Sequence, residues 1–96
     1  MKIIGEYETV LAHSQTITLP VGAEFIHVGT MPSEPDTPVL WVLHEQIKPE
    51  TVLMNYEVMM ASGSTEFDES FNLKHIGSFP IRGNSVMVHA FQRLGV

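Results

Sequence analysis

Apolar and polar residues alternate with a period of two through most of this chain, and Gly, Pro, Asn or Ser interrupts the alternation at short intervals. The segment Gln15-Thr16-Ile17-Thr18-Leu19 is a clear case, in which we expect Ile17 and Leu19 to face inward. A period of two puts successive side chains on opposite faces of a strand, whereas a helix needs apolar residues every three or four positions. The pattern therefore predicts an all-β domain.

The alternation predicts about seven strands, a number typical of a small sandwich or barrel. We expect them over residues 2–10, 15–19, 24–30, 39–45, 52–61, 73–81 and 85–93. The last two form a hairpin across Arg82-Gly83-Asn84, because Gly and Asn tolerate the left-handed conformations of such a turn. The three prolines within 31–38 predict an exposed loop, and 62–72 is expected to be irregular. The fold class that follows is all-β, a single small antiparallel sandwich or barrel.

Length and composition narrow the class of protein. The chain has 96 residues, 44% hydrophobic and 17% charged, which predicts one domain over residues 1–96 with a packed core. A net charge of −6 argues against direct nucleic-acid binding, which needs clustered cations. No apolar run approaches the roughly 20 residues that cross a bilayer, and Glu6 and Glu8 interrupt any secretory signal, so we expect no membrane partner. The absence of cysteine excludes thiolate metal sites and cysteine nucleophiles.

Five motifs are spread over nearly the whole chain. They are Ile4-Gly5-Glu6-Tyr7, Gln15-Thr16-Ile17-Thr18-Leu19-Pro20-Val21-Gly22-Ala23-Glu24, Leu40-Trp41-Val42-Leu43, His75-Ile76-Gly77-Ser78-Phe79 and Val88-His89-Ala90-Phe91. In this order the chain resembles a family of short uncharacterised proteins of bacteriophages and prophages, with Ser78 in place of the family's threonine, Ala90 in place of its valine and a different 31–38 segment. The resemblance implies a phage origin and no activity. Since the chain has neither a bilayer-spanning run nor a secretory signal, the expected location is the host cytoplasm.

The five histidines are scattered over separate segments, at positions 13, 27, 44, 75 and 89. No pair has the His-x-x-x-His or His-x-His spacing that presents two metal ligands from one element, and only folding can bring His27, His44 and His89 together. We expect hydrogen-bonded sheet histidines, no metal site and no cofactor.

Motifs for catalysis are missing from the sequence. There is no Gly-x-Ser-x-Gly, dinucleotide or P-loop pattern, and the acidic cluster Glu66, Asp68 and Glu69 is typical of a solvated surface. We therefore expect a protein that is not an enzyme.

A candidate ligand site combines two predicted strands. Trp41 and His44 on 39–45, with Arg82, His89 and Arg93 at the C-terminal hairpin, supply aromatic faces and cationic groups suited to a base and its phosphates. The alternative is that Trp41 belongs to the core and the arginines balance nearby acids.

The strands predicted at 39–45 and 52–61 are apolar on both faces, and we expect 39–45 to be the central strand. A homodimer through Met54, Val58, Met59 and Met60 would bury the surplus, and a monomeric sandwich with both strands central is the competing arrangement.

Three functional hypotheses follow from the sequence. The first is a non-catalytic phage or prophage accessory protein that acts by binding a host protein, in host takeover or counter-defence. The second is an oligomeric binder that sequesters a nucleotide second messenger, and the third is a virion or assembly component.

Overall fold

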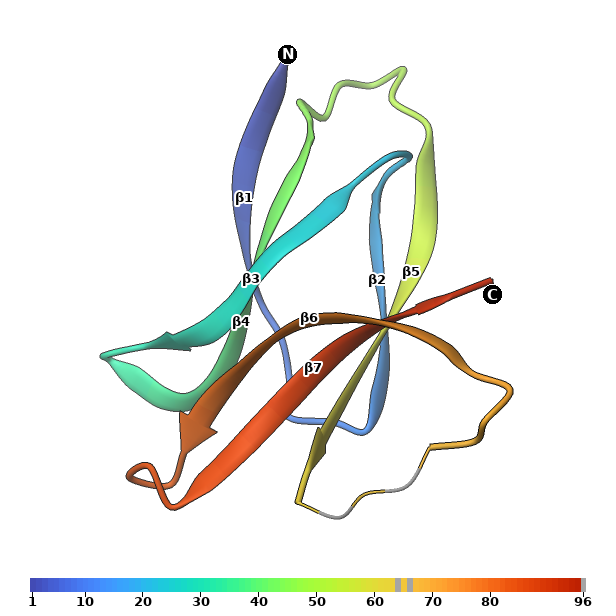
Figure 1. The fold of residues 1–96 in the computed structure, drawn as a ribbon. Helices are drawn as coiled ribbons and strands as arrows, with labels where there is room; N and C mark the ends of the chain where they lie inside the picture. The colour runs from blue at the N-terminus through green and yellow to red at the C-terminus, as the bar shows by residue number, and fades with distance from the viewer. Residues whose placement is uncertain (64, 66, 96) are drawn as a thin grey trace.

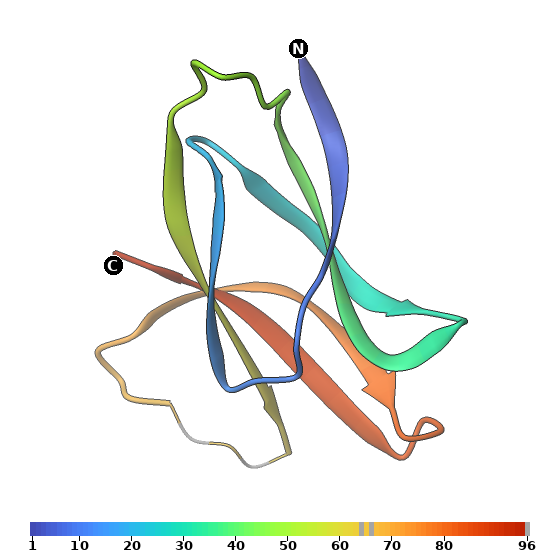
Figure 2. The same ribbon diagram turned by 180° about the vertical axis from the view of Figure 1, so that it is seen from behind.

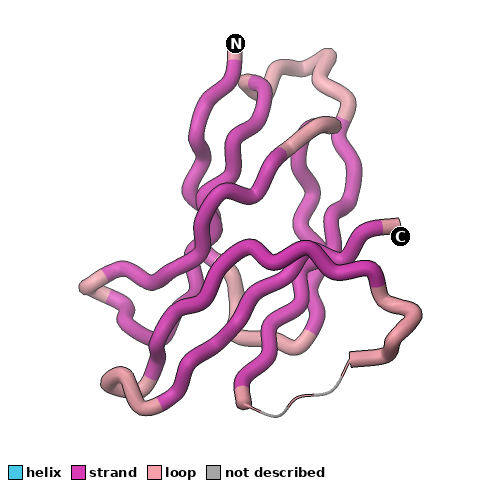
Figure 3. Tube along the Cα trace, in the orientation of Figure 1, coloured by secondary structure: helices cyan, strands magenta, loops and turns pink. Residues whose placement is uncertain are grey.

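The computed structural model describes residues 1–63, 65 and 67–95, and within them the chain forms seven antiparallel strands (Figures 1 and 3). The strands are β1 (Lys2–Glu8), β2 (Ser14–Pro20), β3 (Glu24–Met31), β4 (Glu34–Glu45), β5 (Leu53–Ser62), β6 (Asn72–Ile81) and β7 (Val86–Leu94). The all-β prediction is confirmed. The described part of the chain holds no helix, and so none that is long and apolar enough to span a bilayer.

The strands form two sheets, of order β1-β4-β3 and β2-β5-β7-β6. Seen from behind, β1 and β2 lie in front of the other strands (Figure 2). The sheets are not joined into a closed cylinder, so of the two predicted architectures the sandwich is the one adopted. The strand predicted to be central, β4, lies between β1 and β3.

The core lies between the sheets and draws on every strand. Leu19, Val42 and Val58 are fully buried, and Ile17 packs against the same cluster, so the inward faces predicted for Ile17 and Leu19 are confirmed. On one side the sheets come close at β3 and β6, where a Cβ on Gly77 would lie 3.1 Å from Val28 Cγ1. A larger residue at Gly77 would push β6 away from β3 and open the core on that side.

The loop predicted for 31–38 is wrong, because β4 begins at Glu34. The pairing with β3 passes from Thr30↔Pro38 directly to Met31↔Glu34, which leaves 35–37 as a bulge with no partner in β3. Pro35 is tolerated there because a residue in the bulge has no ladder hydrogen bond to lose. Pro38 contributes its carbonyl, which accepts the Thr9 N–H at 2.9 Å.

The hairpin between β6 and β7 turns where it was predicted. Arg82, Gly83 and Asn84 have φ of 52°, 64° and 70°, the left-handed conformations of such a turn. The Arg82 N–H donates to Asp36 Oδ1 at 2.8 Å, so the bulge of β4 supports the hairpin. The turn places the Arg82 side chain on the surface, at one end of the sandwich.

A buried hydrogen-bonded pair links β1 to β4. The Tyr7 hydroxyl lies 2.6 Å from His44 Nε2, and His44 Nδ1 lies 2.6 Å from the Glu45 carbonyl oxygen. Since a carbonyl only accepts, Nδ1 carries the hydrogen, and Nε2 accepts from Tyr7. His44 is 1% exposed, so it is a core residue and not a group on a binding surface.

Gly5 provides the space for this pair, because a Cβ there would lie 2.6 Å from Tyr7 Cε2 and 2.9 Å from His44 Nε2. We expect Gly5→Ala to lower the free energy of unfolding by about 1 to 3 kcal/mol, measured by urea denaturation. The control is Gly29→Ala, whose Cβ would meet the exposed, movable His27 ring at 3.3 Å and should change stability little. Equal losses in the two variants would contradict this role for Gly5.

Removing the Tyr7 hydroxyl should destabilise the protein more at neutral pH than at alkaline pH. At pH 7, Tyr7→Phe leaves His44 Nε2 without its partner, which should cost about 1 to 3 kcal/mol. Burial raises the pKa of the Tyr7 hydroxyl above its ordinary value of 10.0. The folded state then holds this proton more tightly than the unfolded state. The stability that the protonated Tyr7 hydroxyl contributes is therefore intact below pH 10 and is lost as the pH rises through the pKa of the folded state. Urea denaturation along a pH series should show that the free energies of unfolding of wild type and Tyr7→Phe become more similar above pH 10. A constant difference would refute the stabilising role of the protonated Tyr7 hydroxyl.

Candidate functional site

The five residues predicted to hold a ligand do not form one site. Trp41 lies on the outer face of the three-stranded sheet, its ring centroid 5.2 Å from that of His27. His44 is in the core and Arg82 is at the hairpin turn. His89 and Arg93 share the outer face of the four-stranded sheet with Phe91. The suggested convergence of His27, His44 and His89 is therefore wrong, since each lies in a different layer.

Three of the four residues predicted at a dimer interface are covered within a single chain. Val58 and Met60 belong to the core cluster, and Met59, on the other face of β5, is 2% exposed. Of the four, Met54 alone is exposed, at 41%. A contact between copies through Val58, Met59 and Met60 is thus not available, and homodimerisation by another surface stays a prediction.

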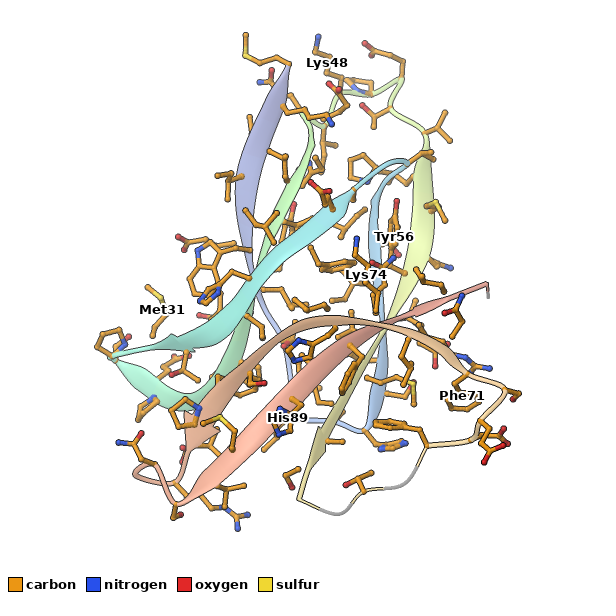
Figure 4. All side chains as sticks on the ribbon, in the orientation of Figure 1. Met31, Lys48, Tyr56, Phe71, Lys74 and His89 are labelled. Carbon is orange, nitrogen blue, oxygen red and sulfur yellow. The ribbon has the colours of Figure 1, made fainter. Side chains whose placement is uncertain are left out.

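Aromatic and imidazole rings cover the outer face of the four-stranded sheet. We call them the ring layer, which consists of His13, Phe67, Phe71, His75, His89 and Phe91. Successive centroids are 5.7 Å apart for His13 and Phe67, 5.6 Å for Phe67 and Phe91, 5.2 Å for Phe91 and His75, and 6.4 Å for His75 and His89. Figure 4 labels His89 on β7 and Phe71 in the segment that leads into β6. Met59 is buried on the same face and is the partner of Phe91 in the register of β5 and β7.

Arg93 joins the ring layer to the sheet. Its guanidinium carbon lies 3.8 Å from the Phe71 ring centroid, a cation–π contact, and Nη1 is 3.7 Å from Glu57 Oε1. Glu57 also accepts a hydrogen bond from the Ser14 hydroxyl at 2.8 Å. Arg93 therefore has local partners, as the alternative in the sequence analysis proposed.

A β-bulge brings His75 to this face. The pairing of β6 with β7 passes from His75↔Phe91 to Gly77↔Ala90, which leaves Ile76 as the extra residue. In a regular strand residues three apart face opposite ways, so His75 and Ser78 share a face because of the bulge. Ser78 Oγ then lies 3.3 Å from His75 Nε2 and 2.6 Å from His89 Nδ1.

Sequence reasoning missed the cluster of His75, Ser78 and His89 because it assigned faces by parity. The available signal was the glycine at 77 inside a predicted strand, since such a glycine often marks a bulge.

The chemistry of this cluster favours binding over catalysis. A serine nucleophile needs a histidine that is held in turn by a third group, usually a carboxylate. Here both imidazoles contact the same hydroxyl, so neither ring orients the other. Among residues 1–63, 65 and 67–95, no three His, Asp or Glu side chains are placed to share one metal ion.

Acidic groups border the ring layer. Asp68 and Glu69 are exposed and follow Phe67, whereas Glu66, which the sequence analysis grouped with them, lies outside the described residues. The Ser70 N–H donates to Asp68 Oδ1 at 2.8 Å, and hydrogen bonds from Ser70 lower the pKa of the Asp68 carboxyl below its ordinary value of 3.8. Asp68 is therefore ionised at neutral pH and adds to the acidity of this border.

A cavity of about 330 Å³ opens at the end of the sandwich near the β6–β7 turn. Arg82, Ser62 and Leu11 line it, and His13 belongs to both this cavity and the ring layer. None of the other residues predicted to bind a ligand lines it.

These features define a two-sheet antiparallel β-sandwich with a layer of rings on the outside of its larger sheet. The chain belongs to the family described as "Domain of unknown function (DUF7352)", which matches residues 1–95. No curated protein and no solved structure matches it. The prediction that the chain belongs to an uncharacterised family is confirmed, whereas a phage origin stays a prediction.

The covering of Met59 can be tested by oxidation. We expect Phe67→Ala to open the ring layer and to speed the conversion of Met59 to its sulfoxide by peroxide, followed by peptide mass spectrometry. Met54, which is already exposed, is the internal control and should react at the same rate in both proteins. An unchanged rate at Met59 would show that Phe67 is not what covers it.

Proposed function

We propose that this chain is a non-catalytic accessory protein of phage or prophage origin that acts in the host cytoplasm by binding a host protein, in host takeover or counter-defence. The phage assignment rests on the motif resemblance. The observation that supports binding is the ring layer, whose rings lie on the hydrogen-bonded strands of the four-stranded sheet and on the segments beside them.

The composition of the ring layer matches that of protein recognition surfaces. Aromatic residues, Arg and Met are enriched in the centres of interfaces, where a few of them supply most of the binding energy. Phe67, Phe91 and Arg93 are each half-buried, so they are already ordered in the free protein but still offer surface to a partner. Prior ordering lowers the entropy lost on binding.

Charge indicates the kind of partner. Asp68 and Glu69 border the ring layer, and the whole chain carries −6. A basic protein surface would be attracted to this face, and the association should weaken as salt screens the charges. The proposed partner is therefore a host protein with a basic patch around an apolar centre.

The nucleotide hypothesis has less support, because Trp41, His44 and Arg82 lie in three places away from His89 and Arg93. The proposal of a virion or assembly component draws on no feature of the ring layer, and mass spectrometry of purified particles would test it.

The test is quantitative capture from lysate of infected host cells at low salt, with the double variant His75→Ala/Arg93→Ala beside wild type. The control is His27→Ala, which removes an exposed imidazole from the outer face of the other sheet. We expect one host protein to be captured by wild type and by the control, and to fall about tenfold or more with the double variant. Capture of the same protein by all three, or of none, would overturn the proposal.

A further inference from the structure

We infer that His75 and His89 form a binding site for a divalent transition-metal ion, at the point now occupied by the Ser78 hydroxyl. The inference concerns the purified chain alone and does not depend on the proposed protein partner. It is carried by the way two imidazoles from neighbouring strands are directed at one point.

The two ring nitrogens converge on Ser78 Oγ, at 2.6 Å for His89 Nδ1 and 3.3 Å for His75 Nε2. Imidazole nitrogens bind zinc at about 2.0 to 2.1 Å, so a small inward movement of both rings brings them to ligand distance. The Ser78 side chain is exposed and can turn to another staggered rotamer, which frees the point for an ion.

The sheet holds the two ligands in place before any ion binds. His89 pairs with Ser78 in the register of β6 and β7, and the bulge at Ile76 turns His75 to the same face. His75 also packs against the Phe91 ring, at a centroid distance of 5.2 Å. Bulges often lie next to functional sites, where they redirect one side chain, and that is the effect of this one.

The charge of the chain favours a cation over an anion at this point. The same two rings and hydroxyl offer N–H and O–H groups to a phosphate, but a net charge of −6 and the acids beside the ring layer oppose an anion. Imidazole suits Zn²⁺, Ni²⁺ and Cu²⁺, whereas Mg²⁺ and Ca²⁺ prefer oxygen ligands. The remaining coordination positions face solvent, so water or a group from another molecule completes the shell.

The experiment uses tag-free protein labelled with ¹⁵N and titrated with Zn²⁺ alone, with Mg²⁺ as the ion that should not bind. We expect the imidazole ¹⁵N resonances of His75 and His89 to shift in a saturable way, and those of His27 to stay. His75→Ala should weaken Zn²⁺ binding by about tenfold or more, whereas the control His27→Ala should leave it unchanged.

Ser78→Ala distinguishes the proposed position of the ion from a site elsewhere on the ring layer. Removing the hydroxyl vacates the point of convergence, so Zn²⁺ should bind at least as tightly as to wild type. A tenfold loss in Ser78→Ala would overturn the placement. Equal shifts at all five histidines, equal losses in His75→Ala and His27→Ala, or no saturation by about 1 mM would overturn the site itself.

Discussion

The contact between Gly77 and Val28 is the constraint on which most of this structure depends. Among the described residues the two sheets share no ladder, so side-chain packing is the main contact between them. β6 lies close against β3 at Gly77, where a Cβ would lie 3.1 Å from Val28 Cγ1 and would force one of the two strands to shift. Gly77 also follows the extra residue of the bulge in β6. The close approach of the two sheets on the inner face and the bulge that places His75 on the outer face are thus neighbours in β6.

The same bulge marks the limit of what the sequence predicts. Strand number, the hairpin at 82–84 and the central place of β4 all follow from local alternation and turn chemistry, and these are confirmed. Which face a residue occupies depends on parity along the strand, and each bulge reverses that parity without a strong local signal. For that reason His75 and Ser78 were missed, and the three prolines within 31–38 indicated a loop where β4 bulges instead.

β5 has apolar residues on both faces, and it shows how a small domain can bury the second apolar face without a second copy of the chain. Met60 and Val58 face the core, while Met59 is buried on the opposite face beside Phe91. The Phe91 ring lies 5.6 Å from that of Phe67, which belongs to the segment after β5. Periodicity identifies a strand that needs cover on two sides. Periodicity does not say which residues cover the second face, because that depends on where a phenylalanine distant in the sequence lies in the fold. A second copy of the chain and a later segment of the same chain are both compatible with the pattern.

The two proposals make opposite demands on the charge of the ring layer. A basic partner is attracted by the acids at Asp68 and Glu69, whereas a divalent ion held by His75 and His89 adds positive charge to the same surface. The His75 ring that would hold the ion lies 5.2 Å, centroid to centroid, from the Phe91 ring. If both ligands bind and water completes the shell of the ion, the charge of the ion weakens the association with a basic partner. Linkage then requires the partner to weaken ion binding by the same factor, since the coupling free energy is shared. Taken together, the two proposals predict that this face binds its partner with a strength that depends on the supply of metal.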